Sequence, residues 1–174
     1  MTSTANPWIG ELMQRHLDAA YNLGRWLLGN EHDAADAVHD AYLRAARAAD
    51  TYAGGNERAW WLAIVRNCCL AKIATRKRES HLRAVESSQP PTVAADAESD
   101  TQARQFREHV ADKLRELPSE FREALVLREI EDLSYREIAD VLDVPIGTVM
   151  SRLARGRAML QRAFADVQEK ADGV

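Results

Sequence analysis

A short polar segment near the middle of the sequence divides the chain into two halves. Residues 87–100, SSQPPTVAADAESD, combine Ser, Pro, Ala and Asp and offer almost nothing apolar for a core to bury. Such a composition is typical of a flexible linker between folded domains. We therefore predict two small domains, residues 1–85 and 104–174, joined by a flexible acidic linker over residues 86–103. Each domain is near the lower size limit for an independent hydrophobic core.

Both domains are predicted to be helical. Only 8 Gly and 5 Pro interrupt a 174-residue chain in which Ala, Leu, Arg and Glu are abundant. Apolar residues recur at helical spacing, so we expect an all-α fold. The predicted helices cover residues 8–28, 33–49, 106–117 and 118–131, and another begins near residue 57. In the first of them we expect one side to carry Leu12, Leu17, Tyr21 and Leu28.

The clearest motif lies in the second domain. Ser134 begins a Ser-Tyr-Arg-Glu capping box, in which the Glu137 side chain bonds back to the start of the helix. Asp143-Val144-Pro145 then interrupts the pattern, and a further helix follows with Val149 and Leu153 facing inward. A capped short helix, a tight break and a longer basic helix predict a helix-turn-helix, whose second helix enters the major groove of DNA.

The distribution of charge favours a nucleic-acid partner, although the net charge of −4 does not. Residues 66–78 and 151–162 contain no acidic residue. Stretches of this kind carry the cations that meet DNA phosphates. The basic residues are Arg66, Lys72, Arg76, Lys77 and Arg78 in the first stretch, and Arg152, Arg155, Arg157 and Arg162 in the second.

The outer face of the last helix follows from its periodicity. Successive side chains turn by about 100°, so a core seam at Val149 and Leu153 defines which residues point away from the domain. In a helix-turn-helix, such residues meet base edges and flanking cations meet phosphates. The predicted DNA-facing residues are Thr148, Met150, Ser151, Ala154 and Arg155, with Arg152 and Arg157 flanking the seam.

The second domain resembles part of a known family. The matching residues, 117–160, read LPSEFREALVLREIEDLSYREIADVLDVPIGTVMSRLARGRAML. They contain a Leu-Pro helix start, a Leu-Ser-Tyr entry to the helix-turn-helix, and a Gly-Thr-Val then Ser-Arg-Leu recognition helix. This text resembles the C-terminal promoter-binding domain of extracytoplasmic-function sigma factors, the small alternative sigma subunits of bacterial RNA polymerase.

The first domain carries an independent resemblance to the same family. Residues 33–44, DAADAVHDAYLR, resemble the helix that binds core polymerase. Residues 60–67, WWLAIVRN, and the basic tail to Arg78 resemble the helix and loop that hold the melted −10 promoter element. The two matches follow the family's order, across a linker of the expected type.

The resemblance implies a function. The first domain would bind the polymerase clamp and capture the non-template strand of the −10 element, and the second would bind the −35 element as duplex. Asn67 is expected to contact a flipped-out base, whereas at least one of Trp60 and Trp61 is expected in the core. The residues carried over are Asp36, Val38, His39 and Asp40 for polymerase, and Trp60, Trp61, Arg66, Asn67, Lys72, Arg76, Lys77 and Arg78 for the −10 element. Those for the −35 element are Thr148, Met150, Ser151, Arg152, Ala154, Arg155 and Arg157.

Three residues depart from the family pattern. Met150 stands where Lys or Arg is common, so a phosphate or base contact is expected to be missing. His39 stands where Gln is usual and Ala37 where Leu is usual, which is expected to change clamp affinity. No self-inhibitory element is recognisable in the sequence, so the resemblance implies regulation by an anti-sigma factor.

Two other classes of function fit the sequence less well. An enzyme would need a nucleophile constellation, a phosphate-binding loop or a metal motif, and none is recognisable. Asp36 and His39 resemble half of a dimetal site, but no other histidine has an acidic residue three positions earlier. We therefore expect no catalysis, metal, cofactor or small-molecule substrate. A stand-alone helix-turn-helix regulator is the alternative, but it leaves residues 33–44 without a role.

The remaining features concern redox state and location. Adjacent Cys68 and Cys69 are either a redox sensor or, as we expect, buried free thiols. Apolar runs are shorter than the ~18–20 residues needed to span a bilayer, and the N-terminus shows no signal segment. We expect no membrane insertion and a cytoplasmic location.

Overall fold

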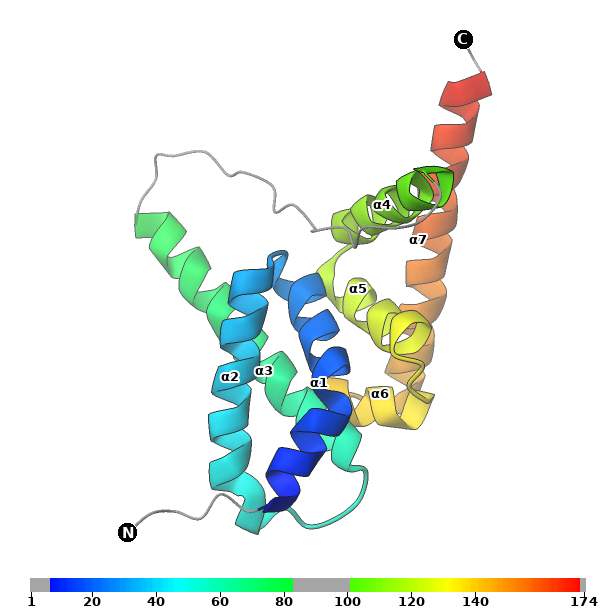
Figure 1. The fold of residues 1–174 in the computed structure, drawn as a ribbon. Helices are drawn as coiled ribbons and strands as arrows, with labels where there is room; N and C mark the ends of the chain where they lie inside the picture. The colour runs from blue at the N-terminus through cyan, green and yellow to red at the C-terminus, as the bar shows by residue number, and fades with distance from the viewer. Residues whose placement is uncertain (1–6, 83–100, 173–174) are drawn as a thin grey trace. The chain divides into compact units, whose positions relative to one another are not determined.

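The computed structural model describes residues 7–82 and 101–172, and helices account for most of both ranges (Figure 1). Helices α1, α2 and α3 belong to one compact unit, and α4, α5 and α7 to a second. Neither described range contains a strand. The all-α, two-domain prediction is therefore confirmed, while residues 86–100 of the predicted linker lie outside the described residues.

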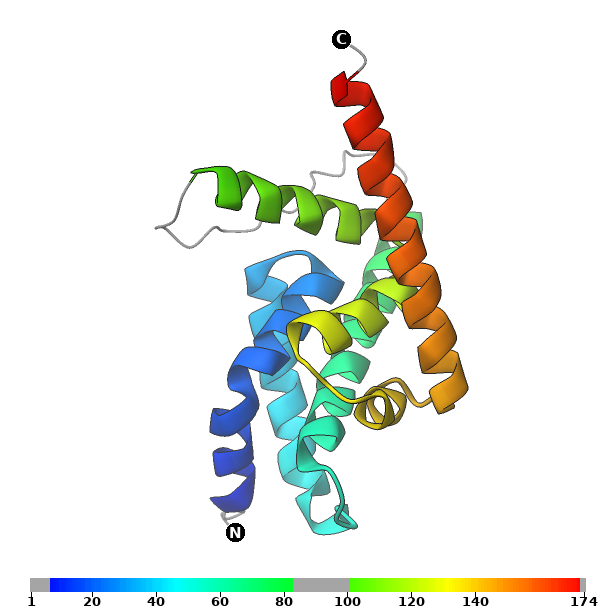
Figure 2. The same cartoon turned by 90° about the vertical axis from the view of Figure 1, so that its right-hand side faces the viewer.

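Three helices pack against one another in the first unit. They are α1 (Pro7–Leu28), α2 (Glu31–Ala48) and α3 (Glu57–Leu82), and each contacts the other two. α1 and α2 run antiparallel, and α3 crosses them (Figures 1 and 2). A short 3₁₀ turn, η1 (Ala49–Thr51), ends α2 before the loop that leads into α3.

None of the helices within the two described ranges has the length and apolarity that crossing a membrane requires.

The turn between α1 and α2 forms as the sequence predicts. Gly29 adopts a φ of 80°, a conformation that favours glycine. Asn30 is the N-cap of α2, and its side-chain oxygen accepts a hydrogen bond from the Asp33 N–H at 2.8 Å. The two helices then approach closely, because a Cβ on Gly24 would lie 3.2 Å from the Ala34 Cβ.

The expected buried side of α1 is only partly correct. Leu12 and Leu28 are buried and Tyr21 is half-buried, but Leu17 is 43% exposed. The backbone of α1 departs from helical geometry at His16 (φ −123°, ψ 20°), so the regular step of about 100° per residue does not carry the core side from Leu12 to Leu17. The core side of α1 instead carries Ile9, Leu12, Ala19, Ala20, Leu23 and Leu27.

The second unit is built around a long C-terminal helix. Its elements are α4 (Thr101–Glu116), α5 (Ser119–Leu125), a π-helical turn η2 (Val126–Ile130) and α7 (Ile146–Asp172). The short helix α6 (Tyr135–Leu142) belongs to this unit as far as Ala139. α5 packs along α7, and α4 also contacts α7 (Figure 2). α4 begins at Thr101, earlier than the predicted residue 106, so the last three residues of the predicted linker are helical.

Close packing fixes α5 against α7. Gly156 of α7 is buried, and a Cβ at this position would lie 2.9 Å from Leu125 Cδ1 and 3.2 Å from Leu125 Cγ. Arg122 of α5 ties the unit to the end of α4, since its guanidinium donates to the carbonyls of Arg115 and Leu117 at 2.8 and 2.9 Å. Partial burial lowers the pKa of Arg122 from its usual value.

Candidate nucleic-acid interface

The predicted helix-turn-helix motif is present at α6 and α7. The Ser134 N–H donates to Glu137 Oε2 at 2.7 Å, and the Glu137 N–H donates to Ser134 Oγ at 3.3 Å, so the capping box is closed in both directions. Asp143 has a φ of 53° and ends α6. The Pro145 carbonyl then accepts from the Thr148 N–H at 2.9 Å, which starts α7.

The outer face of α7 presents the residues predicted to read DNA. Val149 and Leu153 are buried, as the core seam requires. Thr148 is half-buried, and the exposed members of the predicted set are Met150, Ser151, Ala154 and Arg155. The small side chains of Ser151 and Ala154 allow the backbone of α7 to approach the major groove of DNA closely.

The arginines of α7 differ in their partners. Arg152 pairs with Glu120 of α5 at 3.8 Å. Arg157 donates through two nitrogens to one carboxylate oxygen of Glu129, at 2.6 and 3.1 Å, and this hydrogen bonding raises the pKa of Arg157 above its usual value. No ion pair engages Arg155 within the described part of the chain. Of these three arginines, Arg155 is therefore the one that can contact DNA without first breaking an ion pair with a carboxylate.

The two tryptophans at the start of α3 lie in different environments. Trp61 is fully buried, at 0% exposure, so it is the tryptophan expected in the core. Trp60 is half-buried and forms an aromatic cluster with Trp8 and Tyr52, with ring centroids 5.8 and 5.0 Å from its own. Asn67, two turns further along α3, is exposed.

Sequence reasoning missed this aromatic cluster. Trp8 and Tyr52 stack with ring centroids 4.9 Å apart, although 44 positions separate them in the chain. The Trp8 ring nitrogen donates to a Glu57 carboxylate oxygen at 3.2 Å, and Arg15 forms an ion pair with the same carboxylate. The tertiary packing of α1 on α3 creates the cluster, and no local pattern signals it.

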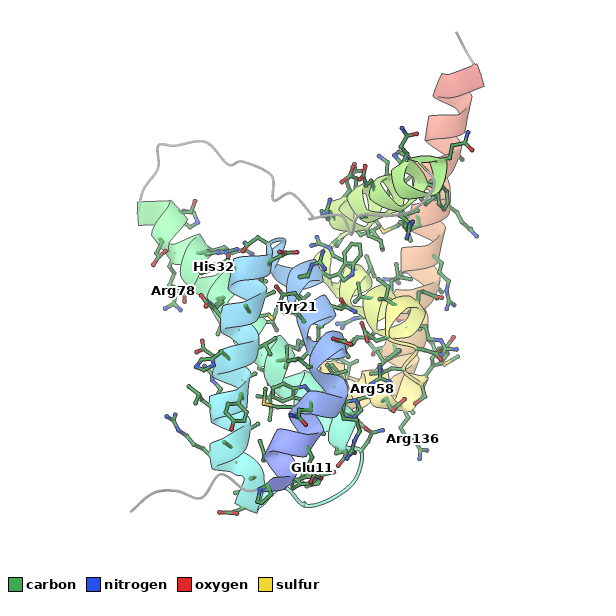
Figure 3. The ribbon with its side chains drawn as sticks, viewed as in Figure 1. Glu11, Tyr21, His32, Arg58, Arg78 and Arg136 are labelled. Carbon is green, nitrogen blue, oxygen red and sulfur yellow. The ribbon has the colours of Figure 1, made fainter. Side chains whose placement is uncertain are left out.

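Acidic residues of α2 partner two of the α3 cations. Lys72 lies 3.6 Å from an Asp36 carboxylate oxygen, and Arg76 forms an ion pair with Asp33. Asp36 also lies 3.8 Å from His32, at the beginning of α2 (Figure 3). The remaining basic residues, Lys77 and Arg78, are exposed on the last turns of α3, where Figure 3 labels Arg78, while Arg66 is half-buried.

The four residues carried over for polymerase binding do not share one environment. Asp36, His39 and Asp40 are exposed on α2, whereas Val38 is buried toward α1. Val38 and His39 line an open groove of about 610 Å³ between α1 and α2. The other lining residues are Met13, Leu17, Asp18, Tyr21, Asn22 and Ala35.

Both cysteines are buried free thiols, as expected. Burial raises the pKa of the Cys68 thiol, which favours its protonated form. The nearby Arg44 guanidinium acts in the opposite direction but does not overcome this burial.

Family comparisons account for both units. A model described as Sigma-70 region 2 matches residues 12–79, and one described as Sigma-70, region 4 matches residues 107–160. The first range contains the candidate polymerase and −10 residues, and the second contains the helix-turn-helix.

Individual relatives agree with this assignment. The chain is 36% identical to the sigma factor SigE of Mycolicibacterium smegmatis over 92% of its own length and 63% of the relative. It is 31% identical to the sigma-E factor of Escherichia coli K12, over 72% of this chain and 70% of that protein. The chain thus spans less than two thirds of the mycobacterial relative but most of the Escherichia one.

Solved structures show the same fold. A co-crystal structure of the sigma factor RpoE with the anti-sigma factor NepR from Bartonella quintana matches with a TM-score of 0.75 and 25% identity, covering 90% of this chain and 96% of that one. CnrH in complex with the cytosolic domain of CnrY matches with a TM-score of 0.67 and 26% identity, covering 94% and 92%. The region 2 match accounts for residues 33–44, which a stand-alone regulator leaves unexplained. The chain therefore belongs to the extracytoplasmic-function family, the alternative sigma factors of bacterial RNA polymerase that direct promoter-specific initiation.

Proposed function

We propose that three surfaces of this chain carry the three binding functions of a sigma factor. The exposed face of α2 binds core RNA polymerase, the C-terminal part of α3 holds the −10 element, and α7 reads the −35 element. The observation that supports the proposal is that each range matched by a sigma-70 model contains exposed cations from an acid-free stretch. These cations are Arg76, Lys77 and Arg78 in α3, and Arg155 and Arg157 in α7. No catalytic step is assigned to the chain, and the cytoplasm, where polymerase acts, is its proposed location.

At the −35 element, Arg155 is proposed to contact a base edge or a phosphate, since it is exposed and outward-facing. Ser151, Ala154 and Thr148 are proposed to lie against the groove floor. Arg152 and Arg157 are proposed to orient α7 through Glu120 and Glu129 and to reach phosphates only at the edges of the site.

At the −10 element, Asn67 is proposed to hydrogen-bond a base of the melted strand. The aromatic cluster that contains Trp60 is proposed to offer a ring on which a second base stacks. Arg66, Lys72, Arg76, Lys77 and Arg78 are proposed to follow the backbone phosphates. Trp61 is left out of this site, because a fully buried indole cannot reach a nucleotide.

The polymerase-facing residues are proposed to be Asp36, His39 and Asp40, with Val38 shaping the groove between α1 and α2. The same surface is proposed to bind an anti-sigma factor, since the structural neighbour RpoE is described in complex with one. Such an inhibitor would compete directly with polymerase.

Reconstituted transcription with core polymerase and genomic DNA tests the proposal. Start-site mapping should reveal a set of promoters that share −10 and −35 sequences and that core polymerase alone does not use. Binding of the full-length protein to core polymerase should be measured in parallel. If no binding is detected at micromolar protein, the sigma assignment of this chain is wrong.

A further inference from the structure

The N-terminal part of α7 carries an apolar row that the described contacts of the second unit leave uncovered. Met150 is 54% exposed and Ile146 is 41% exposed, although both are large hydrophobic side chains. Exposed Ala154 continues the row, because residues four apart on a helix share a face. Val149 and Leu153, in contrast, are buried. The row of Ile146, Met150 and Ala154, called the α7 apolar row below, is thus distinct from the core seam.

The surroundings of the α7 apolar row are complementary to DNA. No acidic residue occurs from Ile146 through Arg162, so this part of α7 attracts phosphates rather than a basic partner. Exposed Arg155 lies beside the row and carries hydrogen-bond donors, and exposed Ser151, whose hydroxyl donates to the Thr148 carbonyl at 3.0 Å, presents an acceptor oxygen. At Gly147, where an added Cβ would meet nothing within 4 Å, the surface is open for close approach.

The major groove of DNA offers one distinctly apolar group on its floor, the C5-methyl of thymine. We propose that Met150, flanked by Ile146 and Ala154, packs against the C5-methyl of a thymine in the −35 element and so determines part of the promoter specificity. The inference rests on the proposed function, because it requires α7 to enter the major groove. A flexible thioether suits this contact, because an unbranched methionine adapts its shape to an irregular apolar surface.

Thymine-to-deoxyuridine substitution tests the contact because it removes only the methyl group. The holoenzyme should be assembled with core polymerase on a promoter found by start-site mapping, and each −35 thymine should be replaced in turn. We expect one position to weaken binding about fourfold, the value for one buried methyl-sized group. In the Met150→Ala variant, deoxyuridine at that position should no longer weaken binding. The effects of deoxyuridine at the other positions should stay as in the wild type.

Met159→Ala is the matched control, since it truncates the same side chain on the same helix outside the apolar row. It should keep the wild-type penalty. The inference is overturned if wild-type holoenzyme is insensitive to every substitution, if the −35 element contains no thymine, or if Met150→Ala retains the full penalty. In those cases promoter-specific transcription persists and the proposed function stands, whereas loss of such transcription from the wild-type protein overturns both.

Discussion

The two basic helices of the molecule are partnered by acidic residues in different ways. In the second unit, Arg152 and Arg157 of α7 pair with Glu120 and Glu129, which belong to the elements that support α7. In the first unit, Lys72 of α3 pairs with Asp36 of α2, a residue proposed to meet polymerase. The α7 pairs therefore connect the helix proposed to read DNA to its scaffold, whereas the α3 pair connects two proposed binding surfaces.

The shared ion pair of the first unit predicts that polymerase binding and −10 element binding are coupled. Exposed ion pairs contribute only about 0–1 kcal/mol each, so neither set determines the stability of its unit. A polymerase that engages Asp36 would compete with Lys72 for that carboxylate and leave the ammonium group available to a phosphate. We expect such coupling in the first unit and none through Glu120 or Glu129 in the second.

The largest expected effect comes from Asp36→Arg. Charge reversal at this proposed polymerase contact should weaken core polymerase binding by about 2 kcal/mol or more, close to thirtyfold. In the absence of polymerase, the same substitution should leave binding to a −35 duplex unchanged, because Asp36 lies in the other unit. Binding to core polymerase and to a −35 duplex measured side by side checks both expectations.

Asp50→Arg serves as the control for this charge reversal, since Asp50 is also exposed but lies beyond the C-terminal end of α2, in η1. It should bind core polymerase nearly as the wild type does. Normal core binding by Asp36→Arg would mean that the proposed polymerase face of α2 is wrongly assigned.

Removing Arg155 should have the next largest effect. Arg155→Ala should weaken −35 binding by roughly 1–3 kcal/mol if the side chain contacts a base, and by less if it contacts only phosphate. Arg157→Ala should cost less, because Glu129 already engages that guanidinium. Equal losses for both variants in a duplex titration at several salt concentrations would show that the ion pair does not divert Arg157 from DNA.

The scaffold of α7 is tested through Gly156. Gly156→Val should destabilise the protein by about 1–3 kcal/mol, because its side chain would overlap Leu125 of α5. Gly147→Ala, in the same helix but in open space, should be neutral or stabilising by up to ~1 kcal/mol. Chemical denaturation of both variants measures the difference, and an unchanged midpoint for Gly156→Val would contradict the tight packing.

Local patterns predicted the elements of the fold well. The capping box at Ser134 and the break at Gly29-Asn30 depend on residues that are close in sequence, and both occur as expected. The face of α1 was harder to predict, because Leu17 is apolar yet lies off the core side. The break in helical geometry at His16 changes the side of α1 that faces the core, and the apolar pattern alone does not signal it.

The candidate site was predictable as residue types but not as contacts. The acid-free stretches marked the cations as residue types, yet Lys72 and Arg76 meet carboxylates of α2 that lie 36 and 43 positions earlier in the chain. The cluster of Trp8, Tyr52 and Trp60 depends in the same way on tertiary packing. Periodicity within one helix cannot reveal which neighbour a charge or ring will meet.

The smallest expected effect tests the coupling itself. Asp36→Asn removes the carboxylate charge that Lys72 faces, so the free protein should bind a single-stranded −10 oligonucleotide about two- to threefold more tightly at low salt. Core polymerase affinity should fall at the same time, because Asp36 is also a proposed polymerase contact. Glu129→Gln is the matched change in the second unit: it frees Arg157 toward a −35 duplex but should leave core affinity unchanged. If Asp36→Asn alters neither affinity, or if Glu129→Gln alters core binding as strongly, the two basic helices do not differ in the way their ion pairs suggest.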